Sequence, residues 1–428
     1  MAYTPGKKKI LMISYSWPPG RNVGIYRSFK FAKYLDNFGW EPTVVAPETG
    51  KKIGSFDRID GIRTLRTGYK DALKIFKSKI KKTKSQTPPF FLKKIARELL
   101  TIPDEARGWY KPALEKISDL LRREHFDAIY STSPPETSHF IAKAVKKRFG
   151  VPWIADLRDP WAGNHYFQAG LLKNSVSKIL EKKILNKADI LVTVSDPWSD
   201  TLKRLYPGMK NRVFTITHSF DRNDRLNKDV KADKGKFIIS YTGKIHRDFQ
   251  DPGPFFRALG LILDKGVFDR NLIRVRFYTF GYYRPDLEAM IKRHNLDGIV
   301  RLYGQVSHEE SILRQLESTA LLFIDWRTRK PLYSKGVCPH KIFEYMGAEK
   351  PILVVSAAGG AACRILKTSG AARLAANERE LEEILEEWFK EFREKGGIDC
   401  KVKKNVLEKY SAEFTTGQLA GLLDKISG

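Results

Sequence analysis

Four loops of the sequence carry side chains that can bind or activate a substrate. Three of them follow apolar runs: "SWPPGRNVGIYR" (16–27), "ADLRDPW" (155–161) and "YTGKIHRD" (241–248). The fourth, "KGVCPHKIFEYMGAEKPILVV" (335–355), leads into an apolar run. The first loop lacks the GxGxxG pattern of dinucleotide-binding folds, and GxxxxGK[ST] is missing from the whole sequence. The chemistry of these loops must therefore be inferred residue by residue.

The first and third loops each combine a glycine with a possible anion contact. Gly24 stands where a helix begins, and a glycine there lets backbone N–H groups approach a phosphate or a sugar. Lys244 follows a strand and Gly243, so its ammonium group can point toward an anion. The alternatives are a tight turn at Gly24 and a solvated lysine at a strand end.

The second loop places Asp156, Arg158, Asp159 and Trp161 after an apolar strand. Charged side chains in that position need partners, which a ligand cleft or an internal Asp–Arg ion pair can supply. His139 lies on the helix that follows "STSPP", where it either reaches the cleft or packs in the core.

These loops must be positioned by parallel sheets, because short β-branched runs alternate with helical patterns along the whole chain. Strands are expected at 10–16, 41–47, 62–68, 127–133, 152–159, 189–195 and 213–218, then at 237–243, 273–281, 300–306, 320–326 and 351–357. Helices are expected at 24–38, 111–124, 137–149, 170–187 and 197–206. A polar stretch at 219–236 separates the two series, so the sequence predicts an α/β protein with two doubly wound domains. Open α/β sheets bind ligands at the carboxyl ends of their strands.

Composition limits the class of protein. A chain of 428 residues exceeds one hydrophobic core, and no apolar run is long enough to cross a bilayer. Three widely spaced cysteines without a CxxC pair indicate a reducing compartment and no structural zinc site, so we expect a cytoplasmic protein. The net charge of +28 indicates an anionic partner. Nucleic acid is not favoured, because no RNA- or DNA-binding motif is visible.

The segment 70–98 concentrates this charge. It holds ten Lys or Arg residues against two acidic ones, a net charge of +8, with aromatic and aliphatic side chains interleaved. Such a segment predicts peripheral binding to an anionic membrane surface, and the alternative is a solvated basic loop.

Taken in order, several stretches resemble one family. They are "ILMISYSWPPGRNVGIYRSFKFAKYLDNFGWEPTVVAP", "ITHSFD", "IISYTGKI", "VRLYGQVSHEE" and "PHKIFEYMGAEKPILVV". Together they are similar to the nucleotide-sugar glycosyltransferases of family 4. The resemblance implies the GT-B fold, with two Rossmann-like domains facing a central cleft. It implies an acceptor-binding domain at 1–220, a nucleotide-sugar domain at 235–405, and a C-terminal helix at 408–428 that packs on the first domain.

The resemblance also implies roles for particular residues. Lys244 stands where the family carries a cation for the pyrophosphate, and Gln250 replaces a second lysine, for which Arg247 or Lys341 substitutes. Glu344 matches the second carboxylate of a Glu-x7-Glu pair, which binds the ribose, whereas Gly336 replaces the first. The nucleotide-sugar set is Gly24, Gly243, Arg247, Gly281, Gly336, Val337, Cys338, Lys341 and Glu344; the catalytic set is Lys244, Asp156 and Arg158; and the acceptor set is Arg27, His139, Asp159 and Trp161.

The resulting hypothesis is a retaining, metal-independent glycosyltransferase without a cofactor. It would use a UDP- or GDP-sugar donor and a lipid-linked or surface-polysaccharide acceptor, at the inner face of the membrane. The rival hypothesis is a catalytically inactive sugar- or nucleotide-binding homologue, which the replacements at Gly336 and Gln250 would explain. The donor sugar, the acceptor and the oligomeric state are not readable from the sequence.

Overall fold

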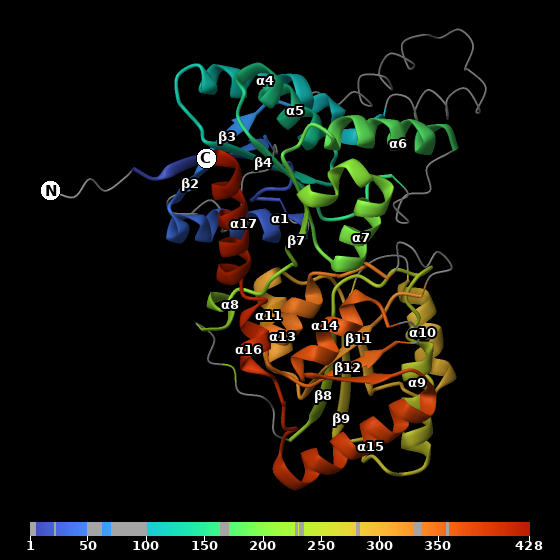
Figure 1. Ribbon diagram of the computed structural model, residues 1–428. Coiled ribbons are helices and arrows are strands. Elements are labelled where there is room, and N and C mark those ends of the chain that lie inside the picture. The colour runs from blue at the N-terminus through green and yellow to red at the C-terminus, as the bar shows by residue number, and fades with distance from the viewer. Residues whose placement is uncertain are drawn as a thin grey trace, which may run out of the picture. The chain divides into compact units, whose positions relative to one another are not determined.

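The computed structural model describes residues 6–20, 23–48, 62–69, 101–162, 171–226, 230, 235–279, 283–327, 335–356 and 359–428. The chain forms two compact units, Met1–Thr217 with Glu413–Gly428 and His218–Ala412. The predicted membrane segment 70–98 and Gly281 lie outside the described residues. Both units consist of parallel sheets with helices around them (Figure 1).

The first unit contains a seven-stranded sheet in the order β3-β2-β1-β4-β5-β6-β7. Its strands are β1 (Lys8–Ile13), β2 (Trp40–Pro47), β3 (Arg63–Thr67), β4 (Ala128–Ser133), β5 (Trp153–Leu157), β6 (Ile190–Thr193) and β7 (Val213–Thr215). All pairs are parallel; for example, Ile13 pairs with Val45 on one side and Ser131 on the other. The order reverses between β1 and β4, which is the position where open α/β sheets bind their ligands.

Helices pack on both faces of this sheet because their apolar faces are buried there. They are α1 (Gly24–Tyr34), α4 (Tyr110–Leu121), α5 (Thr137–Phe149), α6 (Leu171–Leu185), α7 (Asp196–Leu205) and α17 (Ala412–Ser427), with 3-10 turns at Leu35–Phe38, Glu105–Trp109 and Pro207–Arg212. The C-terminal helix α17, drawn in red, lies among the N-terminal elements drawn in blue (Figure 1). Its Leu419 and Leu423 share a core cluster with Ile10 and Trp40.

The second unit repeats the same arrangement with six strands in the order β10-β9-β8-β11-β12-β13. They are β8 (Phe237–Thr242), β9 (Ile273–Tyr278), β10 (Val300–Tyr303), β11 (Ala320–Ile324), β12 (Ile352–Val355) and β13 (Ala372–Ala375). The helices are α8 (Asn223–Leu226), α9 (Gly253–Asp264), α10 (Arg284–Arg293), α11 (His308–Leu316), α13 (Lys341–Gly347), α14 (Ala361–Ser369), α15 (Glu378–Lys395) and α16 (Lys404–Glu408). Its order reverses between β8 and β11, beside the loops that begin at Gly243 and Asp325.

The predicted fold class is confirmed, and the differences from the sequence analysis are local. Each expected strand is present, but most end earlier than predicted: β5 stops at Leu157 and β9 at Tyr278. Strand β13 was not predicted, because its four residues "ARLA" form an edge strand that pairs only with β12. The chain crosses between units at 217/218 and 412/413, whereas the expected boundary was 219–236.

Candidate functional site

A buried ion pair lies at the centre of the first unit. Arg27, on α1, donates from Nε and Nη2 to the two carboxylate oxygens of Asp156, each at 2.9 Å. Both side chains are almost fully excluded from solvent. Asp156 also accepts from Tyr130 Oη at 2.6 Å and from Thr132 Oγ1 at 2.9 Å. Arg27 further donates to the backbone oxygens of residues 216 and 217, so one guanidinium joins α1, β5 and the segment after β7.

The position of Asp156 corrects the sequence analysis. Asp156 lies inside β5, within the expected strand 152–159, and its carboxylate is covered, so it does not belong to the functional loop that we assigned at 155–161. The internal Asp–Arg ion pair that we weighed does exist, but its arginine is Arg27 and not Arg158. Burial raises the pKa of Asp156, yet the charge and hydrogen bonds of Arg27 and the hydroxyl donors outweigh it, so the pKa lies below its ordinary value. Burial and the nearby carboxylate hold the pKa of Tyr130 well above its ordinary value.

Arg158 is placed differently, beside the start of α1. Its Nε donates to Ser133 O at 3.0 Å and its Nη2 to Pro134 O at 2.5 Å. A Cβ on Gly24 would overlap the guanidinium, so only glycine lets α1 begin this close to the arginine. The first turn of α1 carries no acidic residue, and Val23 provides no side-chain cap.

These observations make this corner of the first unit electropositive. The first N–H groups of a helix lack partners within the helix and carry a partial positive charge. Burial lowers the pKa of Arg158, and the charges of Asp159 and Asp156 oppose that effect. A guanidinium and a helix N-terminus side by side are suited to contact an anionic group.

The other predicted acceptor residues of this unit are mostly covered. Trp161 is 7% exposed and its ring packs edge-on against Phe140 at 5.8 Å between centroids. Asp159 is half-buried, and burial raises its pKa against the charge of Arg158. His139 is fully buried, and its Nδ1 lies 2.8 Å from Ser131 Oγ, which also accepts from Trp153. Of the two alternatives for His139, the structure shows the packed one.

In the second unit, Lys341 reaches the loop that follows β8. Its Nζ donates to Tyr241 Oη at 2.7 Å and lies 4.1 Å from the centre of that ring. A Cβ on Gly243 would lie 2.9 Å from this Nζ, so the glycine leaves the space that the ammonium group occupies. Loss of solvation lowers the pKa of Lys341 to about 7, against the favourable charge of Glu344. Residues predicted from two separate loops therefore meet here: Gly243 and the backbone of Lys244 from one, and Lys341 from the other.

Glu344 lies one turn further along α13 and is held by two histidines. Its Oε1 is 2.7 Å from His308 Nε2 and 3.1 Å from His340 Nδ1. Burial opposes ionisation of this carboxyl, but the two histidines outweigh it, and the pKa of Glu344 lies well below its ordinary value. Both histidines contact the same oxygen, so Oε2 keeps its capacity to accept hydrogen bonds from a ligand.

The remaining predicted residues of the second unit fall into two groups. Lys244 and Arg247 are exposed, and Arg247 pairs with Asp286 at 3.1 Å. Val337 and Cys338 are buried, with 3% and 4% exposure, and Gly336 precedes them in the same loop. Gln250, which replaces a family lysine, is also turned inward: its amide donates to Ile324 O at 2.6 Å and accepts from His246 N at 3.0 Å. Gln250 therefore braces the loop after β8.

The sequence analysis missed several polar residues near this edge of the sheet. His340 precedes Glu344 by four residues, a helical spacing that could have indicated it. His308 and the cluster of Asp325, Ser356 and Cys363 gave no such signal, because their partners are distant in sequence. Asp325 follows β11 and accepts from Ser356 Oγ at 2.7 Å and from Cys363 Sγ at 3.0 Å.

Two further observations concern the described residues only. They contain no group of three or more His, Cys, Asp or Glu residues arranged to hold a metal ion. Within the same ranges, no helix has both the length and the apolar character needed to span a membrane.

Because this ion pair is buried, we expect removal of one partner to lower the free energy of unfolding more than replacement of both partners does. Asp156→Ala leaves the Arg27 guanidinium buried without its counter-charge, and should lower the free energy of unfolding by about 3 to 5 kcal/mol. Urea denaturation followed by circular dichroism measures this loss. Asp119→Ala removes the exposed pair with Arg122 and should cost less than about 1 kcal/mol. The double variant Arg27→Met/Asp156→Leu should be less destabilised than Asp156→Ala; equal or greater loss would contradict this account.

The buried histidine predicts a specific pH dependence of stability. The pKa of His139 falls from 6.5 to about 4 on burial. The unfolded chain binds this proton below pH 6.5 and the folded protein only near pH 4, so stability falls as the pH drops through that window. The loss amounts to about 3 kcal/mol. The urea midpoints of the parent and of His139→Asn are measured at pH 7, 5.5 and 4.5. The difference between the two midpoints should shrink as the pH falls. A difference that is the same at all three pH values would rule this explanation out.

Residues 27–217 match the glycosyl transferase 4-like domain family. No curated protein matches the sequence. In structure, the chain is similar to sucrose-phosphate synthase from Thermosynechococcus elongatus, with 13% identity, 98% of this chain and 99% of that chain covered, and a TM-score of 0.63.

Two other solved structures are similar over nearly the whole chain. Anabaena HepE in complex with UDP-glucose is 14% identical, with 97% of this chain and 99% of that chain covered and a TM-score of 0.62. A mutant of S. aureus TarM, in complex with fondaparinux, α-GlcNAc-glycerol and UDP, is 12% identical, with 97% of this chain and 100% of that chain covered and a TM-score of 0.57. Residues 27–217 therefore belong to the glycosyl transferase 4-like domain family, and the two Rossmann-like units have the GT-B fold that the sequence predicted.

Proposed function

We propose that this glycosyltransferase transfers a sugar, with retention of its anomeric configuration, from a nucleoside-diphosphate donor to a glycan or lipid-linked acceptor. The observation that carries the proposal is the edge of the second sheet, where an ionised carboxylate and the ammonium group of Lys341 lie beside the turn that carries Lys244. Glu344 keeps one oxygen available, while Lys341 and Lys244 flank the turn at Gly243. A nucleotide sugar offers a matching pair of groups, vicinal ribose hydroxyls and a diphosphate.

In this proposal each group has a separate role. Glu344 accepts hydrogen bonds from the ribose hydroxyls through Oε2, and the two histidines keep the carboxylate charged and fixed. Lys244, with Arg247 or Lys341, neutralises the diphosphate as it leaves. Negative charge on the leaving group is greatest in the transition state, so these cations accelerate transfer more than they strengthen binding. A UDP- or GDP-sugar is the proposed donor; in the similar HepE structure the bound molecule is UDP-glucose.

The proposed chemistry uses protein cations in place of a divalent metal, with no cofactor. Support comes from the sequence, which contains no DxD pair to hold such an ion against a diphosphate. The backbone at Gly336, Val337 and Cys338 replaces the missing first carboxylate of the family pattern.

The acceptor is assigned to the first unit. Arg158 and the N-terminus of α1 at Gly24 form an electropositive corner, which suits an acceptor or donor group that carries negative charge. Arg27 and Asp156 support this corner as a buried brace, because their charges satisfy each other. A phosphate-bearing lipid-linked glycan or a charged surface polysaccharide fits this chemistry. The similar TarM structure contains fondaparinux and α-GlcNAc-glycerol beside UDP.

A catalytically inactive binding homologue is the second candidate. The observations in its favour are Gly336 in place of a carboxylate and Gln250 turned into the protein in place of a lysine. Both candidates bind a nucleotide, but only the first releases nucleoside diphosphate from a nucleotide sugar.

The deciding experiment combines turnover with a substitution at Glu344. Purified protein is incubated with a panel of UDP- and GDP-sugars, and released nucleoside diphosphate is measured with and without EDTA. We expect release from one donor class, unchanged by EDTA. Glu344→Ala should weaken binding of the free nucleoside diphosphate about tenfold or more, since hydrogen bonds to a charged group contribute roughly 1.5 to 3 kcal/mol.

The matched control for this experiment is Glu394→Ala, at an exposed position of α15. It should bind like the parent. Binding without turnover for every donor would favour the inactive homologue. Equal affinity of Glu344→Ala and parent would refute the assigned site.

We also propose that residues 70–98 hold the protein on the cytoplasmic face of an anionic membrane. Their charge of +8 and interleaved apolar side chains are the support. Replacing Lys77, Lys79, Lys81 and Lys82 by Glu brings this charge to zero and should abolish co-sedimentation with phosphatidylglycerol vesicles at moderate salt. Release of nucleoside diphosphate in the absence of vesicles should persist. If the variant co-sediments as well as the parent, the segment is a solvated loop and does not bind the membrane.

A further inference from the structure

The two segments by which the chain enters and leaves the second unit are joined to each other. Phe220 N donates to Tyr410 O at 3.0 Å, and Ala412 N donates to Phe220 O at 2.8 Å. The ring of Phe220 then packs on the end of α13, where a Cβ on Gly347 would lie 2.8 Å from its side chain. Phe220 and residues 410–412 therefore form one wall at the end of α13.

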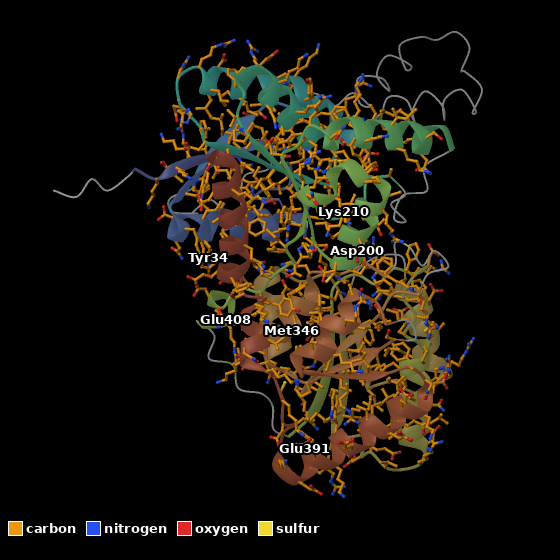
Figure 2. All side chains as sticks on the ribbon, in the orientation of Figure 1. Tyr34, Asp200, Lys210, Met346, Glu391 and Glu408 are labelled. Atoms are coloured by element: carbon orange, nitrogen blue, oxygen red, sulfur yellow. The ribbon has the colours of Figure 1, made fainter. Side chains whose placement is uncertain are left out.

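A cavity of about 610 Å³ lies against this wall. Its apolar lining comes from Phe220, Leu316 and Leu407, all of which are largely buried. Its lining residues lie on or beside α8, α11, α13 and α16, which Figure 1 labels. Figure 2 labels two landmarks, Glu408 on the lining and Met346, the residue before Gly347. The volume lies within the range of about 300 to 1,000 Å³ typical of small-molecule sites and exceeds what an inorganic ion fills.

The charges around the cavity are unbalanced. Of the residues that the structure describes, four cationic side chains line it, Arg222, Arg225, Lys350 and Lys404, against two acidic ones. Both acids are already used, because Glu408 pairs with Arg222 and Glu349 pairs with Arg225. Among the described residues, neither lysine has a hydrogen-bond or ion-pair partner.

Lys350 is the group that most needs an anion. It is half-buried, and both burial and the nearby Arg225 lower its pKa. An ammonium group that has lost water without gaining a counter-charge is destabilised. An anion in the cavity would stabilise the charged form in place of the lost water.

We propose that this cavity is a second ligand site, specific for a small organic phosphate. The phosphate would contact Lys350 and Lys404, and the organic part would cover Phe220 and Leu407. A phosphate dianion matches two unpaired cations flanked by guanidinium groups, and the apolar lining requires a body larger than the phosphate itself.

The site is separate from the proposed donor site but shares a helix with it. None of the described residues assigned to the nucleotide sugar lines the cavity. Lys341 and Glu344 stand in the first turn of α13, whereas Gly347 and the residues after it line the cavity. Along the helix axis Gly347 lies about 9 Å from Lys341 and about 4.5 Å from Glu344. A ligand that fixes the end of α13 can therefore influence the helix that carries both donor-site groups, which would make the cavity a regulatory site.

Isothermal titration calorimetry of the full chain at physiological salt tests the proposal. The probes are glucose 6-phosphate, glucose and inorganic phosphate, each with and without saturating UDP. We expect saturable 1:1 binding of glucose 6-phosphate, no binding of glucose, and weaker binding of inorganic phosphate. Lys350→Gln/Lys404→Gln should weaken the binding about tenfold or more, since hydrogen bonds to a charged group are lost. Lys390→Gln, at an exposed position of α15 outside the cavity, is the matched control and should bind like the parent.

Three outcomes would overturn the proposal: no saturable binding, equal binding by the double variant and the control, or loss of binding when UDP is present. The last result would place the phosphate in the donor site. If inorganic phosphate binds as tightly as glucose 6-phosphate, the apolar lining does not contact the organic part of the ligand as proposed. The proposed transfer reaction does not enter this assay, so a protein that fails to turn over nucleotide sugars still gives a decisive answer here.

Discussion

Every strand of both sheets runs parallel to its neighbours, and this constraint determines where chemistry can occur. A parallel pair needs a helical crossover, so all strand-to-helix loops of a unit gather at the carboxyl edge of its sheet. In the first unit this edge brings Gly24 next to Arg158. In the second it brings Gly243 and Lys244 next to Lys341, 97 residues away in the chain. Loops that are unrelated in sequence thereby become one site, and the same strand order in both units repeats the arrangement.

The two units handle buried charge in opposite ways. Asp156 is surrounded by donors, and its partner Arg27 is equally covered, so this pair is complete and contributes support to the fold. Glu344 is also buried and ionised, but its two histidines share one oxygen. Burying a charge is costly unless its hydrogen bonds are supplied. The protein supplies all of them at Asp156 and only part of them at Glu344, which is the difference expected between a structural carboxylate and one that awaits a ligand.

The sequence was sufficient for the fold class because β-branched runs and helical periods mark most elements directly. It was insufficient where the role of a residue depends on a partner that is distant in the sequence. Asp156 was assigned a functional role in the loop 155–161, since nothing nearby shows that Arg27, 129 residues earlier, satisfies its charge within the strand. His308 could not be recognised for the same reason: its partner Glu344 lies 36 residues later. Strand β13 was missed because the edge of a sheet needs little hydrophobic pattern. Local patterns thus predict elements, whereas burial and pairing require the folded chain.

Helix α13 shows how local and distant constraints combine in one short element. Its first turn needs Lys341 to reach Tyr241 on β8, and its middle needs Glu344 to meet His308 at the start of α11. Its last residue must be glycine, because Phe220 of the entering segment packs against it. Each contact fixes the helix from a different direction, and its seven residues leave no turn free to adjust. A displacement of one end of α13 must therefore displace the other end, because a rigid helix shifts as a body more readily than it bends.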